Sequence, residues 1–426
     1  MENDTRHHFR SWKRVGSLFV LAVIVCFSGS YALRWHGIRQ ARQALTIHDP
    51  DLALQWLATA RRFSFDNAEI QFLTARAYRR LGDPEAMRQH LELAGKLGWP
   101  RDVLEREFTL AQAQAGMLQQ AEPYLQGMLL DSGGDGAEIC AAFVNGYVHH
   151  YQFGRAFALL DAWEKDFPVD AEPYMMRGRL RYQWQDWTAA EAAFRAALDR
   201  RPELFEAKLG LAHVLAAQQK LDVAERLYLE CLKSRPHDTG LLIGWGECLA
   251  NQGRPEEAAD VFHQAIANEP DNCSARLGLG KISLDNGDAD EAITWLEPAL
   301  AACPRQPDVR YIYAQALLAS GRKDAAAEHL EFFKSASDAL REVSRLTLHL
   351  VTNPDDLKAR FEVGRLYLEF GTAEEGANWL KTVLAVDPNH VPAHRLLMEY
   401  YQQHGEDDLA EQHRAFLKTS GVPGAS

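Results

Sequence analysis

Apolar residues recur in two helical stripes within each stretch of 34 residues, and between residues 171 and 272 this pattern occurs three times in register. In the middle stretch the first stripe contains Leu211 and Leu215, a polar turn at Gln218–Asp222 follows, and a second stripe begins at Ala224. Apolar positions three and four residues apart are typical of one buried face of a helix. Each stretch is therefore predicted to form two amphipathic helices joined by a short turn.

The three stretches also share residues at fixed positions. A proline follows the second stripe and ends the helix, because proline lacks the backbone N–H and restricts the residue before it. Small residues occupy the position where the two helices of a hairpin are expected to cross. The shared positions are Pro202, Pro236 and Pro270; Ala190, Ala224 and Ala258; Phe194, Tyr228 and Phe262; and the small residues Gly178, Ala212, Gly246 and Gly280.

This period and these columns resemble the tetratricopeptide repeat family. The resemblance implies an all-α fold, a right-handed superhelical solenoid in which each hairpin buries its apolar face against its neighbours. Extended in register along the chain, the pattern predicts about eleven hairpins after one N-terminal transmembrane helix.

The register also predicts boundaries along the chain. The regular spacing fails once, and there Leu340, Val343, Leu346 and Leu350 recur at helical spacing, which predicts an added or extended helix. The predicted parts are a basic tail at 1–14, a transmembrane helix at 15–33, membrane-proximal degenerate units at 34–136, regular units at 137–340, a helical insertion at 341–356, and C-terminal units with a cap at 357–424.

Residues 15–33 are uncharged and mostly apolar, which is just long enough to span a bilayer. Trp12 precedes this segment, and Tyr31 and Trp35 lie at its other end, where interfacial aromatics are common. The alternative is a cleaved signal peptide, because small residues near Ser28 and Ser30 offer a cleavage site. We favour the anchor, since the apolar run continues past that site.

Basic residues lie on both sides of the segment and slightly favour an N-terminus inside the cell, which would place the repeats outside the cytoplasm. The six cysteines show no spacing typical of a disulfide framework. In repeat register, Cys140 and Cys231 occupy core positions, so we expect buried, unpaired thiols.

The composition is that of an ordered protein, with 47% hydrophobic and 25% charged residues. The net charge of −13 argues against nucleic acid as the main partner. Residues 1–100 are nevertheless basic, with 14 Lys or Arg against 9 Asp or Glu. Two interpretations stay open for these cations, contact with anionic headgroups or solvated helix faces: Arg61, Arg62, Arg76, Arg79 and Arg80.

No set of residues indicates catalysis, a cofactor or a metal. Gly278–Ser283 resembles a phosphate-binding loop only superficially, because Ile282 stands where Ser or Thr is needed after the lysine. His149 and His150 are adjacent, so their side chains point about 100° apart on a helix and do not form a pair of ligands. We expect no enzymatic activity and no small-molecule substrate.

The family resemblance implies that the first helices of the hairpins line a concave groove for a peptide or helix of a partner. One column of this groove is polar and a second, one turn earlier, is apolar. The alternative for the apolar column is packing beneath neighbouring helices. The candidate partner-binding residues are Asn145, Met175, Arg179, Leu209, His213, Ile243, Glu247, Leu277, Lys281, Tyr311 and Gln315.

The sequence thus predicts a membrane-tethered, non-catalytic scaffold that binds a protein or peptide partner in an envelope assembly, secretion or signalling complex. Two alternatives remain. The chain is a module that recruits substrates for a separate catalytic chain, or it is an exported repeat protein whose N-terminal segment is cleaved.

Overall fold

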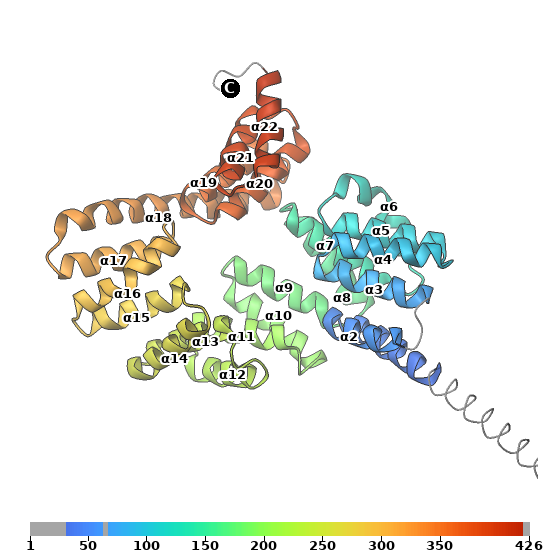
Figure 1. Cartoon of the computed structure of the whole chain (residues 1–426), viewed down its shortest axis with the longest axis horizontal. Helices are drawn as coiled ribbons and strands as arrows, with labels where there is room; N and C mark the ends of the chain where they lie inside the picture. The colour runs from blue at the N-terminus through green and yellow to red at the C-terminus, as the bar shows by residue number, and fades with distance from the viewer. Residues whose placement is uncertain (1–30, 63–66, 421–426) are drawn as a thin grey trace, which may run out of the picture. The chain divides into compact units, whose positions relative to one another are not determined.

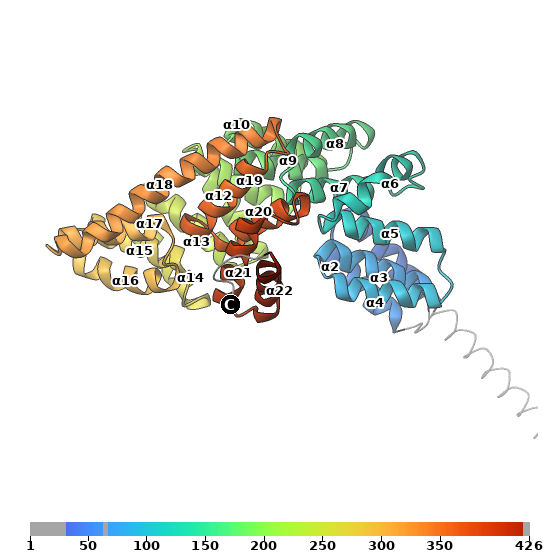
Figure 2. The same cartoon turned by 90° about the horizontal axis from the view of Figure 1, so that it is seen from above.

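The computed structural model describes residues 31–62 and 67–420, and it divides the chain into two compact units, Met1–Gly146 and Tyr147–Ser426. All regular secondary structure in the described ranges is helical (Figures 1 and 2). The predicted tail and nearly all of the predicted transmembrane helix at 15–33 lie outside these ranges. Within them, no helix combines the length and the apolar character needed to cross a membrane.

The first unit begins with helical residues 31–46, whose Ile38, Ala41 and Leu45 are buried. Asp49 caps the next helix by accepting a hydrogen bond from the backbone N–H of Leu52. The helices of this unit are α2 (Pro50–Arg61), α3 (Ala68–Leu81), α4 (Pro84–Lys96), α5 (Arg101–Gln114), α6 (Leu118–Leu130) and α7 (Gly136–His149), and the unit boundary falls within α7.

The second unit is also a succession of helix pairs, and Figure 1 shows its helices α9 to α18 as an arc coloured from green to orange. Its helices are α8 (Phe153–Asp166), α9 (Glu172–Gln183), α10 (Trp187–Arg200), α11 (Phe205–Ala217), α12 (Leu221–Ser234), α13 (Thr239–Asn251), α14 (Pro255–Asn268), α15 (Cys273–Asp285), α16 (Ala289–Ala302), α17 (Pro307–Ala319), α18 (Lys323–Thr352), α19 (Leu357–Phe370), α20 (Ala373–Val386), α21 (Val391–Gln403) and α22 (Asp407–Thr419). With residues 31–46 paired to α2, the described helices form eleven hairpins, in agreement with the predicted repeat.

One position in the turn of nearly every hairpin adopts a left-handed backbone conformation with positive φ. This conformation ends the first helix of the hairpin and reverses the chain. Glycine adopts it without steric cost, and other residues adopt it under strain. The residues at this position are His48, Gly82, Gly116, Tyr151, Gln185, Gln219, Gly253, Gly287, Gly321 and Gly405.

Each aromatic ring of the repeating column is held between two first helices. A Cβ atom added to Gly178 would lie 2.7 Å from the ring of Phe194, and one added to Gly210 of the next hairpin would lie 2.4 Å from the same ring. Gly246 and Gly278 enclose Phe262 in the same way, at 2.7 Å and 2.5 Å. Gly178 and Gly246, predicted at helix crossings, are therefore required by the aromatic ring that fills the crossing, and Gly280 is required in the same way by Leu296.

The predicted insertion at 341–356 is an extension of one helix. Helix α18 is 30 residues long, and Val343, Leu346 and Leu350 are buried on one of its faces. It ends before Pro354, and Asp356 then caps α19 through the backbone N–H of Ala359. The extra length carries the chain past its own hairpin, and α18 also contacts α8.

The cysteines differ from the prediction in one respect. Cys140 and Cys231 are buried, as predicted, and burial raises the pKa of the Cys231 thiol to about 11. However, Cys273 and Cys303 form a disulfide, with Cα atoms 6.3 Å apart. They are 30 residues apart in the sequence, one at the start of the hairpin's first helix and the other at the end of its second. Because the two helices of a hairpin are antiparallel, these two positions lie side by side.

The first unit contains a buried network of charges. Glu107 is fully buried and accepts hydrogen bonds from Arg76 at 2.9 Å and Arg79 at 2.6 Å. Arg79 and Arg80 also pair with Glu138. Burial alone would raise the pKa of Glu107, but the charges of Arg76 and Arg79 outweigh burial and lower it. Both interpretations of the basic surface are wrong for these three arginines, which face protein carboxylates and neither headgroups nor open solvent.

We expect Gly210→Ala to destabilise the second unit by about 1–3 kcal/mol, because the new methyl group overlaps the ring of Phe194 in a filled crossing. Gly127→Ala is the control, since Gly127 lies inside α6 and an added Cβ meets nothing within 4 Å. The control gains helix propensity and is expected to stabilise by about 0.5–1 kcal/mol. Denaturant unfolding measures both, and equal effects would contradict the packing described here.

We expect Glu107→Ala to destabilise the first unit by about 3–5 kcal/mol, because it leaves buried arginines without their partner. Glu105→Ala on the same helix removes an exposed pair with Arg101 and is expected to cost less than about 1 kcal/mol. Folding lowers the pKa of Glu107 below its ordinary value of 4.5. Glu107 therefore contributes its full stabilisation of the folded unit above pH 4.5, and this contribution is lost as the pH falls from 4.5 through the lowered pKa. Urea unfolding at neutral and acidic pH tests both statements.

Candidate functional site

The first helices of five successive hairpins in the second unit present one polar residue each at the same helical position. Arg179, Glu247 and Lys281 are exposed, whereas His213 and Gln315 are partly buried. Because the hairpins repeat every 34 residues, these side chains recur on one face of the array. We call this set the polar row: Arg179 on α9, His213 on α11, Glu247 on α13, Lys281 on α15 and Gln315 on α17. Asn145, predicted with them, is exposed on α7 in the first unit.

The apolar column one turn earlier lies largely within the core. Met175 and Leu277 are buried, and Leu209 and Ile243 are partly buried. Tyr311 stacks on Phe333 of α18, with ring centroids 4.4 Å apart. The buried members of this column pack beneath neighbouring helices, which was the alternative considered from the sequence. The exposed residues of the two columns on these helices are Arg179, Glu247 and Lys281, whereas Leu209, Ile243 and Tyr311 are only partly exposed.

His213 and Glu247, in the middle of the polar row, are closely surrounded by other side chains. His213 lies between two tyrosine rings, with centroids 6.1 Å from Tyr182 and 5.6 Å from Tyr228, and burial lowers the pKa of its imidazole. The side chain of Glu247 reaches solvent, but the protein around its carboxylate partly desolvates it and raises its pKa; Asp308 adds to the rise and Lys281 opposes it. These groups can accept and donate hydrogen bonds to a ligand, and the row offers charges of both signs.

Among the residues that the structure describes, no three His, Cys, Asp or Glu side chains gather as metal ligands. Residues 278–283, which resemble a phosphate-binding loop, belong to the continuous helix α15. Gly278 and Gly280 there face the side chains of Phe262 and Leu296, so both glycines serve packing.

Within the second unit, the stretch from α8 to α20 closes on itself. Tyr151, in the turn before α8, stacks on Trp379 of α20 with ring centroids 3.3 Å apart and an interplanar angle of 8°. Its hydroxyl donates a hydrogen bond to Glu375 at 2.8 Å. A second contact joins the same ends, because buried Arg360 of α19 donates to the backbone carbonyl of His150 at 2.9 Å.

These contacts join residues that are 224 and 210 positions apart in the chain. The hairpins from α9 to α18 therefore bridge two ends that contact each other, and the curvature of the array is held at both ends. Tyr151 occupies the left-handed turn position that is glycine in many hairpins, with φ of 55°. A large aromatic residue in this strained conformation marks a position where the side chain is needed.

Sequence reasoning missed this closure. Two residues of the sequence could have indicated it. Tyr151 stands in the turn position that is glycine in many hairpins, and Arg360 is a charged residue at a position that the structure buries. Neither residue names its partner, because the repeat pattern describes contacts between neighbouring hairpins only.

Comparison with known families identifies the middle of the second unit. Residues 175–239 and 244–307 match the family model described as tetratricopeptide repeat, so these stretches are tetratricopeptide repeats. The matched residues contain four of the five positions in the polar row, from Arg179 to Lys281. A sequence search among curated proteins finds no match.

Solved structures with similar folds include several repeat proteins. A thermophilic tetratricopeptide protein of Thermus thermophilus, TTC0263, is 22% identical, covers 46% of this chain and 99% of its own, and has a TM-score of 0.34. YrrB, described as having an unusual peptide-binding site, is 18% identical, covers 47% and 95%, and has a TM-score of 0.32. The Cut9–Hcn1 complex of the APC/C is 14% identical, covers 89% and 74%, and has a TM-score of 0.45. At these identities and TM-scores the likeness does not bear on function.

We expect Tyr151→Gly to destabilise the second unit by about 2–4 kcal/mol, because the loss of a buried aromatic contact exceeds the relief of strain in the turn. Gln185→Gly makes the same backbone change one hairpin later, where φ is 57°, and is expected to change stability by less than about 1 kcal/mol. Denaturant unfolding gives the stabilities, and small-angle X-ray scattering should show a larger radius only for Tyr151→Gly. Equal behaviour of the two variants would contradict a closing role for Tyr151.

Proposed function

We propose that this chain, whose central hairpins are tetratricopeptide repeats, is a membrane-tethered, non-catalytic scaffold that binds a segment of a partner protein along the polar row. The partner belongs to an envelope assembly, secretion or signalling complex. The observation that carries this proposal is the exposure of Arg179, Glu247 and Lys281 at one repeating position of successive first helices.

The spacing of the row suits an extended peptide. Packed helices lie about 8–10 Å apart, and each successive first helix presents the same position to the row. An extended chain advances about 3.3 Å per residue, so each hairpin is matched by about three peptide residues. The mixed charges give such a peptide a register, because each basic or acidic side chain of the partner has one favourable position. Tetratricopeptide repeats act as protein interaction scaffolds, which agrees with this mode of binding.

The membrane tether and the compartment are parts of the same proposal. The tether is the apolar segment at 15–33, with the N-terminus inside and the repeats outside the cytoplasm. The disulfide between Cys273 and Cys303 supports this placement, because disulfides persist in oxidising compartments and are rare in the cytosol.

Crosslinking and affinity capture from native membranes tests the proposal with the full-length chain. The protein is expected to resist alkaline extraction of the membranes, and Arg179→Glu with Lys281→Glu should lower partner capture by at least about fivefold. Thermal unfolding should barely change, because exposed charges contribute little to stability.

The matched control is Lys233→Glu with Lys334→Glu, which makes the same change of charge on the exposed second helices α12 and α18. This control should capture the partner as the wild type does. Equal capture by all three proteins would exclude the polar row as the binding surface, and release of the protein by alkaline extraction would exclude the tether.

A further inference from the structure

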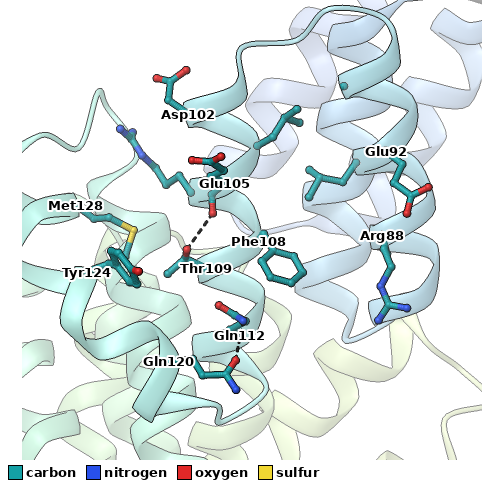
Figure 3. A pocket seen from close by; sticks show the side chains of 14 residues that line it. Arg88, Glu92, Asp102, Glu105, Phe108, Thr109, Gln112, Gln120, Tyr124 and Met128 are labelled. Atoms are coloured by element: carbon teal, nitrogen blue, oxygen red, sulfur yellow. Dashed lines mark hydrogen bonds between the residues drawn. The ribbon is translucent and has the colours of Figure 1, made fainter.

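A groove in the first unit lies apart from the polar row. It has a volume of about 970 Å³ and is lined by one face of each of three helices, α4, α5 and α6. Figure 3 shows Phe108 of α5 pointing into the space beside α4, with Tyr124 and Met128 of α6 on the other side. One end is bordered by a hydrogen bond in which Gln112 donates to Gln120 at 2.8 Å.

Comparison with another hairpin shows why this groove is open. Leu279 of α15 occupies the same repeat position as Phe108, and it is buried in one cluster with Val261 and Phe262 of the preceding second helix, α14. In contrast, the second helix that precedes Phe108 is α4, which packs mainly on α3 and touches α5 near Gly95. Helix α4 therefore leaves Phe108 45% exposed.

The exposed part of the groove is apolar and aromatic. Tyr124 is 62% exposed, and Met128 is only partly buried beside it. The walls continue with Leu91 of α4 and Leu104 of α5. Large apolar side chains that are exposed together in a folded protein mark an interaction site. Here they surround a position that α14 covers in the hairpin of Leu279.

The charge at the groove is negative. Glu92, Asp102 and Glu105 line it, and all three side chains are exposed. Of the two arginines in the lining, Arg88 makes only an exposed pair with Glu85 at 3.3 Å, which water weakens, whereas Arg106 donates to the carbonyl of Ser132 at 2.8 Å and lies 3.9 Å from Asp135. Glu105 accepts from exposed Arg101, an interaction that water weakens. Three carboxylates against two arginines leave the lining with one net negative charge, and this favours a cationic ligand.

We propose that this groove binds a basic amphipathic helix of a partner protein. Its apolar face packs on Phe108, Tyr124 and Met128, and its flanking Lys or Arg side chains face Glu92 and Asp102. A helix fits because the groove runs between helices and replaces the contact that a second helix makes elsewhere in the array. Helix α4 has 13 residues and is about 20 Å long, so a partner helix of similar length fills the groove.

The proposal concerns a different unit and a different kind of partner segment from the polar row. It is tested on the full-length chain with a fluorescein-labelled synthetic peptide of about 14 residues. The peptide contains leucine on one helical face and lysine elsewhere. Fluorescence anisotropy gives its affinity, circular dichroism gives its helicity, and a second peptide with glutamate in place of lysine tests the charge.

Phe108→Ala with Tyr124→Ala is expected to weaken binding of the lysine peptide by at least about tenfold. Glu92→Lys with Asp102→Lys is expected to weaken it and to reduce its dependence on salt. Both variants should keep the thermal unfolding of the wild type, because these four side chains are exposed. The control is Asp199→Lys with Asp260→Lys, which makes the same change in net charge at exposed positions of α10 and α14. It should alter the affinity for the lysine peptide by less than about twofold.

The proposal is overturned if the groove variants bind the lysine peptide as the wild type does, or if the glutamate peptide binds equally well. It is also overturned if Arg179→Glu with Lys281→Glu abolishes peptide binding while the groove variants do not. A concentration-dependent dimer in analytical ultracentrifugation that Phe108→Ala dissociates would assign the groove to a second copy of the chain and would equally contradict a partner helix.

Discussion

The second unit depends on one packing constraint, the large side chain that fills a helix crossing, which is an aromatic ring in its three central hairpins. Phe194, Tyr228 and Phe262 are almost fully buried. Each lies against a glycine of the next hairpin, and Phe194 and Phe262 also lie against a glycine of their own. A ring in this position fixes the separation and the rotation of two first helices at once, because neither helix can approach or turn without overlapping it. The regular spacing of the polar row follows from this constraint, since the row lies on the same first helices.

A chain of such contacts fixes only neighbouring hairpins, and small errors in each crossing add along an open array. The closure between Tyr151 and Trp379, with Arg360 and Glu375 beside it, removes this freedom by joining the two ends. The extension of α18 contributes to the same result, because it contacts α8 after passing its own hairpin. The insertion in the sequence is thus the part of the array that departs from the repeat so that the ends can contact each other.

The sequence predicted those structural features that recur in every hairpin. The columns of Phe194 and Gly178 predicted the crossings, and Leu346 and Leu350 predicted a helix in the insertion. It did not predict contacts that occur once. Arg76 and Arg79 sit on a predicted helix face, yet their partners Glu107 and Glu138 come from two other helices, so only the fold reveals the network. The disulfide was missed for another reason, because its spacing reflects the hairpin rather than a cysteine framework.

The two candidate binding surfaces follow from opposite properties of the same repeat. The polar row exists because the repeat is regular, so its members differ only in the side chain that one helical position carries. The groove exists because the repeat is irregular, since α4 leaves uncovered a position that α14 covers at Leu279. A regular row of mixed charges distinguishes partners by the order of charges along a peptide, whereas an apolar groove distinguishes them by shape. The two proposed surfaces therefore suit two chemically different segments, an extended peptide of mixed charge and an amphipathic helix.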